Sequence, residues 1–235
     1  CASICDSNGN LLFYTDGTVV YNRNHSIMPN GTGLLGHGSS TQSAIIVPKP
    51  CTPTLYYIFT VDGKTGPLGP PRHGLNYSEV DMTLNGGLGD INVNVKNIPL
   101  MPATCEKVTA IKHQNGSDFW IIARAENSNE FTSFKLTSGG IDFNDTAITT
   151  IGTVYNETRG YMKGSPDGTR LAIANWGISD NVDLYDFDAS TGYLSNLATL
   201  HPFPNPSGPQ QGVYGVEFSP NSDILYVSGG ITPFT

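Results

Sequence analysis

The chain has few of the features that mark nucleic-acid-binding or membrane-spanning proteins. Only 12 of its 235 residues are Lys or Arg, against 20 Asp and Glu, which gives a formal net charge of −8. Binding to a phosphate backbone depends on clustered basic side chains, so this balance argues against a nucleic-acid partner. No apolar run approaches the length of about 18 residues that a transmembrane helix needs. The sequence therefore predicts a chain that is not embedded in a membrane.

Helical periodicity is also missing from the sequence. No long segment places apolar residues at the alternating three- and four-residue spacing of an amphipathic helix, so we expect almost no helix. The chain instead contains 27 Gly and 16 Pro, while charged residues make up only 14% of it. Gly and Pro favour tight turns, and this composition is typical of an all-β protein.

Five short strand segments of one kind recur along the chain, each beside a polar turn. They are Leu11–Tyr14, Leu55–Ile58, Phe119–Ile122, Leu171–Ala174 and Leu225–Ser228. They begin between 44 and 64 residues apart, and a repeat of this length built from strands and Gly-rich turns predicts a β-propeller of four-stranded antiparallel blades. Residues 1–235 would form a single domain of about four and a half blades. We expect an incomplete part of a ring of six to eight blades.

The fourth repeat shows the expected order of one blade most clearly. An innermost strand, Tyr161–Lys163, is followed by the turn Ser165–Gly168, in which Pro fixes one φ angle and Gly supplies a positive one. The second strand is Arg170–Ala174, the third is Val182–Phe187, and the outer strand is Tyr193–Leu200. Two Pro-rich segments, Asp62–Asn76 and Pro202–Gln211, interrupt this order as loops. The first is the likelier place for a function specific to one blade.

Four cysteines, Cys1, Cys5, Cys51 and Cys105, lack the C-x-x-C spacing of a zinc site. One interpretation is that they are buried thiols. Alternatively, Cys5 and Cys51 lie where an inner strand meets its turn in neighbouring blades, which would bring them within disulfide range. We predict that disulfide, and a less certain pairing of Cys1 with Cys105. An even number of cysteines in this arrangement favours an oxidising, extracellular setting.

Several stretches resemble one family of propellers. They are Asn10–Gly17, Ser39–Pro48, Gly160–Gly168, Asp186–Asp188 and Tyr214–Asn221. Together they are similar to the amino-terminal propeller region of large secreted proteins of the Bacteroidota, often exported by the type IX secretion system. That region belongs to the wider group of YVTN-like and quinoprotein-dehydrogenase-like propellers. The resemblance implies a location outside the cell or at its surface, and the cysteines at positions 5, 51 and 105 depart from the family pattern.

Charged residues occupy one inner-strand position in three successive blades. These residues are Lys112, Lys163 and Glu217, and we expect them, with His113, to line a central channel. They would form either a small-ligand or ion site, or a ring of solvated and mutually paired charges in which Lys163 pairs with Glu217. A buried ion pair by itself is weak evidence of function.

Two carboxylates, Asp186 and Asp188, lie two residues apart on a predicted strand and face the same side. They are weak candidates for a Ca²⁺ site with turn carbonyls, and an Asx-turn at Asp188 is the competing interpretation. No other metal or cofactor is expected. Ser39 and Ser40 lie in a Gly-rich loop without the G-x-S-x-G turn of a serine hydrolase.

Glycosylation motifs are numerous. The six Asn acceptor sequons are at Asn24, Asn30, Asn76, Asn115, Asn144 and Asn156, and we interpret them as products of an Asn-, Ser- and Thr-rich composition. The Bacteroidota also modify Asp-Thr followed by a small apolar residue. Asp145-Thr146-Ala147 matches that pattern, so Thr146 is the predicted site.

Two functions are compatible with the sequence. The first is a non-enzymatic extracellular propeller, a structural or recognition module of a surface adhesin, appendage or filament whose partners are other protein subunits or surface glycans. The second is a lactonase-like or quinoprotein-like enzyme with its site at the channel mouth. An enzyme would require carboxylates, His and Arg converging at one end of the inner strands.

Overall fold

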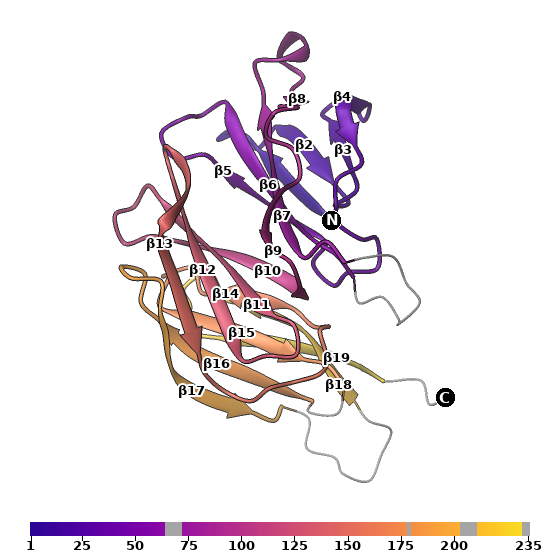
Figure 1. The fold of residues 1–235 in the computed structure, drawn as a ribbon. Helices are drawn as coiled ribbons and strands as arrows, with labels where there is room; N and C mark the ends of the chain where they lie inside the picture. Colours follow the sequence, from indigo (N-terminus) through magenta and orange to yellow (C-terminus); the bar gives the residue numbers. More distant parts are fainter. Residues whose placement is uncertain (64–71, 178–179, 203–210, 232–235) are drawn as a thin grey trace. The chain divides into compact units, whose positions relative to one another are not determined.

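Strands joined by turns make up the chain (Figure 1). The computed structural model describes residues 1–63, 72–177, 180–202 and 211–231. About half of the chain is strand, and in the described residues the one helical element is a 3₁₀ turn, η1 (Asn85–Gly87). The all-β prediction is confirmed. The chain divides into two compact units, unit 1 (Cys1–Val108) and unit 2 (Thr109–Thr235), and the division falls within strand β10.

Unit 1 contains two antiparallel sheets. Blade one is ordered β1-β2-β3-β4, with strands β1 (Ala2–Cys5), β2 (Leu11–Thr15), β3 (Val19–Asn22) and β4 (Ile27–Thr32). Blade two has strands β5 (Ala44–Pro48), β6 (Leu55–Val61), β7 (Leu75–Asp81), β8 (Asp90–Ile91) and β9 (Ile98–Met101). Both β8 and β9 pair with β7, at its two ends, so the outer edge of blade two is divided between two short strands.

Unit 2 continues the same pattern. Blade three consists of β10 (Thr104–Lys112), β11 (Phe119–Ala125), β12 (Glu130–Thr137) and β13 (Gly140–Thr150), and β10 begins before the division between the units. Blade four consists of β14 (Met162–Gly164), β15 (Arg170–Asn175), β16 (Asn181–Phe187) and β17 (Leu194–Leu200). A further pair, β18 (Gln211–Phe218) and β19 (Leu225–Ile231), forms half a blade in the described residues.

The core of each unit lies between neighbouring blades. In unit 1, Phe13 and Met28 of blade one pack with Ile58 and Val80 of blade two. In unit 2, residues of blades three and four form one cluster, which includes Trp120, Phe131, Leu171, Ile173 and Tyr185. A second cluster joins blade four to β18. Full burial of such a side chain contributes about 1.5–3 kcal/mol, so packing between blade faces stabilises each unit.

The five recurring segments of the sequence are the second strands of their blades, β2, β6, β11, β15 and β19. The order predicted for the fourth repeat is also confirmed, from β14 through β17, with each boundary within one or two residues. The divided outer edge of blade two was not predicted. The Pro-rich segment Pro202–Gln211 lies mostly outside the described residues.

The predicted disulfides are wrong for this structure. All four cysteines lie in the described part of the chain, and none of them is in a disulfide. Cys5 ends β1 as expected, but Cys51 lies three residues beyond the end of β5, in a turn where its φ is 58°. Both side chains are exposed, whereas Cys105 is buried in β10. The cysteines therefore give no support to an oxidising environment.

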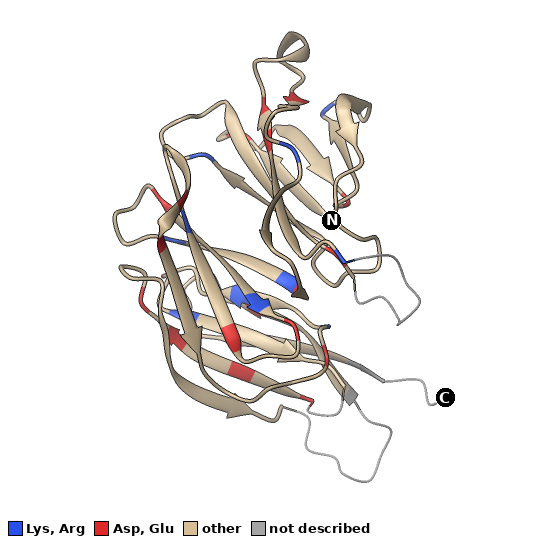
Figure 2. Ribbon diagram, in the orientation of Figure 1, with Lys and Arg blue, Asp and Glu red and all other residues tan. Residues whose placement is uncertain are grey.

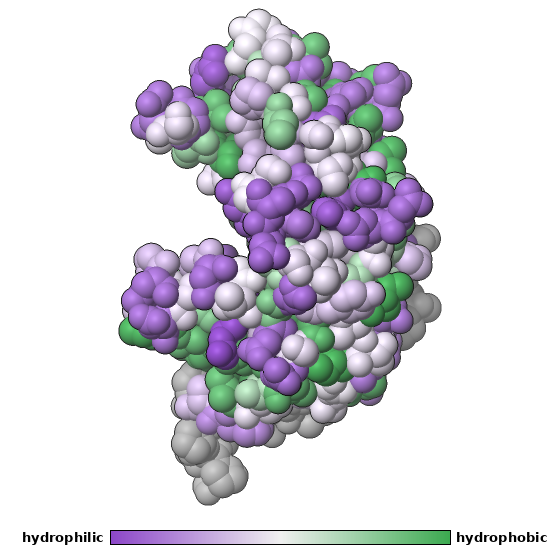
Figure 3. Space-filling model, turned by 90° about the vertical axis from the view of Figure 1, so that its left-hand side faces the viewer, coloured by the Kyte–Doolittle hydropathy of each residue, from purple (hydrophilic) through white to green (hydrophobic). Residues whose placement is uncertain are grey.

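Charged and apolar side chains are dispersed over the surface. Figure 2 shows Lys and Arg distributed singly or in pairs along both units. On the face drawn in Figure 3, hydrophilic and hydrophobic residues alternate over the described surface without one continuous apolar area. None of the described helical residues forms a segment long and apolar enough to cross a membrane.

Candidate functional site

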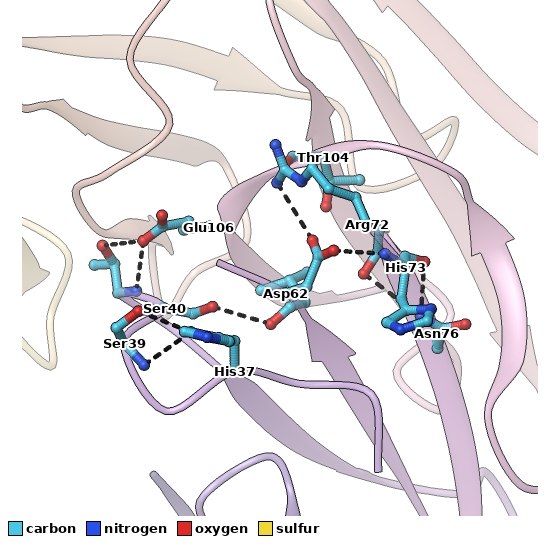
Figure 4. Close-up of polar contacts among 12 residues, drawn as sticks. His37, Ser39, Ser40, Asp62, Arg72, His73, Asn76, Thr104 and Glu106 are labelled. Atoms are coloured by element: carbon cyan, nitrogen blue, oxygen red, sulfur yellow. Dashed lines mark hydrogen bonds and ion pairs between the residues drawn. The ribbon is translucent and has the colours of Figure 1, made fainter. Parts of the chain in front are cut away.

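A buried carboxylate marks the point where the Asp62–Asn76 insertion leaves blade two (Figure 4). Asp62 directly follows β6 and is 6% exposed. Its carboxylate accepts the backbone N–H of His73 at 2.5 Å and a bond from Nη2 of Arg72 at 3.3 Å. Arg72 and His73 lie just before β7. The Asp62 carboxylate therefore links the first residue of the insertion to two residues near its end. Residues 64–71 lie outside the described part.

Arg72 connects this carboxylate to the first residue of β10. Its Nη2 also donates to the carbonyl oxygen of Thr104 at 2.9 Å. The ion pair with Asp62 is largely withdrawn from water, with side-chain exposures of 16% for Arg72 and 8% for Asp62. The Thr104 hydroxyl is buried and has no hydrogen-bond partner among the described residues. The guanidinium is therefore held at a fixed position at the beginning of an innermost strand.

A second buried carboxylate, Glu106, follows two residues later on β10 and therefore shares a face of the strand with Thr104. Glu106 is 3% exposed, and its Oε2 accepts the N–H of Thr41 at 3.2 Å and the Thr41 hydroxyl at 3.5 Å. The Glu106 carbonyl accepts the N–H of Gln42 at 2.9 Å. These bonds hold the loop before β5 against β10.

The same loop carries an exposed His–Ser pair. Ser39 Oγ lies 2.7 Å from Nδ1 of His37, and the Ser39 N–H donates to that nitrogen at 3.2 Å. The Ser40 hydroxyl donates to the carbonyl of Val61 at 3.2 Å. A Cβ at Gly63 would lie 2.8 Å from His37 Nδ1 and 3.4 Å from Ser39 Oγ, so the His37–Ser39 pair lies close to the backbone of the residue that follows Asp62.

The cluster thus combines acids, a cation and titratable rim groups from separate segments of unit 1 (Figure 4). Asp62 and Glu106 are buried acceptors, Arg72 is a partly buried cation, and His37, Ser39 and His73 are exposed. The Ser39–His37 distance is short enough for proton transfer. No carboxylate among the described residues bonds to His37, so the third member of a catalytic triad is lacking there.

The residues predicted to line a channel do not all come together. Lys163 on β14 and Glu217 on β18 form the predicted ion pair, with Nζ 2.8 Å from Oε2 and side-chain exposures of 33% and 60%. Lys112 and His113 lie at the end of β10 and line a separate groove of unit 2. Glu217 is not among the residues of that groove. The role of these four residues in binding remains a prediction.

Asp186 and Asp188 are each engaged with local partners. Asp186 accepts from Asn196 Nδ2 at 3.0 Å and faces Arg170 at 3.8 Å. Asp188 lies beyond the end of β16 and accepts the N–H and hydroxyl of Ser190 at 2.8 and 2.6 Å, which lowers its pKa. The Asx-turn interpretation is confirmed. The described residues contain no group of three or more His, Cys, Asp or Glu that could hold a metal ion.

The predicted glycosylation residue, Thr146, lies on β13 opposite Phe134, and its neighbour Asp145 bonds to Lys135 at 2.7 Å. Modification of Thr146 stays a prediction. The Asn76 sequon is inaccessible in this fold, because Asn76 is 2% exposed and its side-chain amide donates to the carbonyl of His73 at 2.9 Å. This agrees with our interpretation of that sequon as a product of composition.

The cluster of unit 1 was missed at the sequence level because it joins segments as far as 32 residues (Arg72 to Thr104) and 65 residues (Thr41 to Glu106) apart. One signal pointed toward it, because the insertion Asp62–Asn76 is the segment that the sequence favours for a function specific to one blade. Ser39 and Ser40 gave no such signal, since they lack the G-x-S-x-G turn of a serine hydrolase. A further signal was available in the adjacent charged residues Glu106 and Lys107 of a strand-like segment, because inner-strand charges require partners.

Comparison with known proteins gives a match at the level of structure. No protein-family model matches the sequence, and no curated protein matches it. Among solved structures, a periplasmic gluconolactonase of Pseudomonas aeruginosa matches with a TM-score of 0.55 at 14% identity, over 96% of this chain and 62% of that one. A protein of Lactobacillus plantarum matches with a TM-score of 0.54 at 14% identity, over 86% of this chain and 52% of that one. A Bacteroides uniformis protein described as a 6-phosphogluconolactonase matches with a TM-score of 0.50 at 11% identity, over 96% and 76%.

These likenesses show a β-propeller fold. The predicted fold class is confirmed, and with it the broader resemblance to a propeller group. The chain spans about half to two thirds of the length of the Lactobacillus and Pseudomonas proteins. Export by a type IX secretion system stays a prediction.

Proposed function

We propose that the cluster around Asp62, Arg72 and Glu106 binds and hydrolyses the lactone of a hydroxylated acid. The observation that carries this proposal is the convergence of two buried carboxylates, an arginine and an exposed His–Ser pair in unit 1. This is the set of groups that an enzyme reading of the sequence required. Two of the structural neighbours are named as lactonases, which agrees with this proposal.

Hydrolysis of a lactone needs an activated water and a positive group near the carbonyl oxygen. We assign water activation to the His37–Ser39 pair. Ser39 Oγ takes a proton from water as its own proton moves to Nδ1 of His37, across the 2.7 Å that separate these atoms. The hydroxide adds to the carbonyl carbon, and the ring C–O bond breaks. The ring oxygen takes the proton held at Nδ1 of His37, returned through Ser39 Oγ, so the pair regains its starting state. The product is a hydroxy acid.

Arg72 supplies the positive charge, and the carboxylates position the other groups. A guanidinium in a site with little water stabilises negative charge on a carbonyl oxygen more strongly than it would in bulk solvent. Asp62 keeps Arg72 in place at 3.3 Å, and Glu106 fixes the loop that carries His37 and Ser39 through its bonds to Thr41. The buried acids are therefore positioning residues.

Titration of released acid at constant pH tests this proposal, with glucono-1,5-lactone as substrate and the full chain as enzyme. We expect His37→Gln to lower kcat/KM by about 10²-fold or more, as removal of a general base does. His25→Gln is the matched control, because His25 is also an exposed histidine of unit 1, bonded through Nδ1 to Tyr14 at 3.3 Å. The control should keep the full rate.

Two outcomes would contradict the proposal. The first is a wild-type rate equal to the uncatalysed rate, and the second is an equal rate for His37→Gln and His25→Gln. Lactone binding without turnover would instead favour the recognition module that the sequence also allows, with surface glycans or other subunits as partners. A location outside the cytoplasm is compatible with both the lactone hydrolase and the recognition module. The periplasmic location in the name of the Pseudomonas neighbour supports it.

A further inference from the structure

A second polar site lies in unit 2, on a groove of about 560 Å³ between blades three and four. Three segments form its walls: the end of β10 at residues 112–114, the turn 166–169 between β14 and β15, and the turn 187–190 after β16. None of these segments takes part in the cluster of unit 1. The groove is partly open to solvent, so a ligand bound there need not be enclosed.

Backbone and side-chain bonds fix the shape of this groove. The Ala189 carbonyl accepts both the Gln114 N–H and Nε1 of Trp120, each at 3.0 Å, so the two blades are joined at its floor. Asp167 accepts the N–H of Thr169 at 3.1 Å within one turn. Asp188 accepts the N–H of Ser190 at 2.8 Å within the other. A site held in this way loses little conformational entropy when a ligand binds.

The wall from blade three presents hydrogen-bond donors. The Lys112 side chain is exposed and forms no ion pair with any described residue. His113 Nδ1 accepts the N–H of Asn115 at 2.9 Å, so a neutral His113 ring carries its proton on Nε2. The ring is held beside Trp120, with 5.6 Å between the ring centroids. The three N–H groups of the Lys112 ammonium and the Nε2–H of His113 are therefore available as hydrogen-bond donors on this wall.

The wall from blade four presents acceptors. Asp167 and Asp188 both have lowered pKa values: burial raises that of Asp167, but hydrogen bonds from Ser165 and Thr169 outweigh it, and bonds from Ser190 lower that of Asp188. Both remain ionised at neutral pH. Lys112 lines the same groove and forms no ion pair with either carboxylate. The groove therefore carries one cation and two anions.

We propose that this groove binds a neutral oligosaccharide. Each sugar hydroxyl donates one hydrogen bond and accepts others, so a ring placed between the two walls satisfies both. One Lys against two Asp leaves a net negative groove, which disfavours anionic ligands. The exposed Pro166 ring and the partly buried Ala189 methyl group offer apolar contact to sugar C–H groups. A basic peptide would meet the same carboxylates but be repelled by Lys112.

Isothermal titration of the full chain with maltotetraose, cellotetraose, xylotetraose and chitotetraose tests this inference. At least one of them should bind with a Kd of millimolar or lower. Lys112→Met and Asp188→Asn should each weaken that binding about fivefold or more. Asparagine at position 188 retains an acceptor for Ser190, so the turn is preserved.

Arg23→Met is the control, because Arg23 is an exposed cation of unit 1 and lies outside the groove. The affinity of this variant should equal that of the wild type. Absence of binding to all four oligosaccharides would overturn the inference. So would equal weakening by Arg23→Met, which would place the ligand elsewhere, or tighter binding of tetralysine than of any oligosaccharide. The lactone assay of unit 1 is a separate readout, so either proposal can fail alone.

Discussion

Each unit contains a buried aspartate, and the two aspartates have different surroundings. Asp183 in unit 2 is 0% exposed, and its carboxylate accepts bonds from Asn175 Nδ2 at 3.0 Å and Thr199 Oγ1 at 2.8 Å. Its other neighbours, Asn181 and Tyr185, are also buried. The groups that bond to Asp183 all belong to blade four, and Asn181 also donates to the Tyr155 hydroxyl at 3.0 Å.

Asp62 in unit 1 is nearly as buried, but an exposed rim surrounds it. His73 and the His37–Ser39 pair lie in neighbouring segments and remain open to solvent. Burial and hydrogen bonding are therefore common to both aspartates and do not identify a functional site. The distinguishing feature is the presence of exposed, titratable groups next to the buried charge.

The largest expected effect is on stability, at Asp183. Asp183→Ala removes one of the two acceptors of the buried Asn175 amide, the other being Asn181 Oδ1 at 2.8 Å, and it removes a carboxylate that Thr199 and Tyr185 also contact. We expect the free energy of unfolding to fall by about 3–5 kcal/mol, the usual cost of breaking a buried polar network. Urea denaturation followed by fluorescence measures this change.

Asp186→Ala is the control for this experiment. Asp186 lies on the same strand, β16, but its side chain is 44% exposed, and its nearest cation is 3.8 Å away. We expect a loss below about 1 kcal/mol, as for other exposed charged groups. Comparable losses for both variants would show that the buried network contributes no more than an exposed carboxylate.

The next effect concerns Asp62 and combines stability with function. Asp62→Asn retains the shape of the side chain but removes the charge that Arg72 faces at 3.3 Å. We expect a loss of about 1.5–3 kcal/mol, the value of a hydrogen bond to a charged group. The comparison predicts that lactone hydrolysis falls as well, even at a temperature where the variant is fully folded. A folded Asp62→Asn protein with the wild-type rate would contradict the positioning role.

Local sequence signals predicted most of the fold and little of the site. Blade four could be assigned from residues 161–200 alone, because its strands alternate and its turns contain Pro, Asp and Gly at fixed positions. Contacts between distant segments were not accessible in this way. Arg72 reaches Thr104 and Thr41 reaches Glu106 only because blade packing brings their strands together. The Cys5–Cys51 prediction failed for the same reason, since it required a turn position that local pattern does not specify.

Glu157 is a half-buried carboxylate, so it lies between the buried and the exposed carboxylates compared above. Its contribution to stability can be tested by changing the pH. Burial raises the pKa of Glu157, but hydrogen bonds and charge from Arg159 outweigh burial and lower the pKa to about 2 from its usual 4.5. The ion pair measures 2.8 Å. Because the pKa is lower in the folded state, this group stabilises the fold above pH 4.5, and the contribution is lost as the pH falls toward 2.

Glu157→Gln should therefore lower the free energy of unfolding by about 1–2 kcal/mol at pH 7, a value reduced for partial exposure to solvent. The difference from the wild type should shrink between pH 4.5 and pH 3. Urea denaturation at several pH values measures it, with Glu130→Gln, at the start of β12, as the control. A difference independent of pH would contradict the assignment to the Glu157 charge.

The smallest effect on stability is expected at the Lys163–Glu217 ion pair, which is exposed to solvent. Its atoms lie 2.8 Å apart, closer than the buried pair Asp62–Arg72 at 3.3 Å, but its side chains are 33% and 60% exposed. Solvent screening should outweigh the shorter distance, so a double-mutant cycle with Lys163→Met and Glu217→Gln should give a coupling of about 0.2–1 kcal/mol. The coupling should decline between low and 0.5 M salt, since charges in contact with solvent are screened over about 4–10 Å in this range. A coupling above that of the Asp62–Arg72 pair would mean that distance, and not burial, sets the strength of these ion pairs, and the contrast between the two units would then lose its basis.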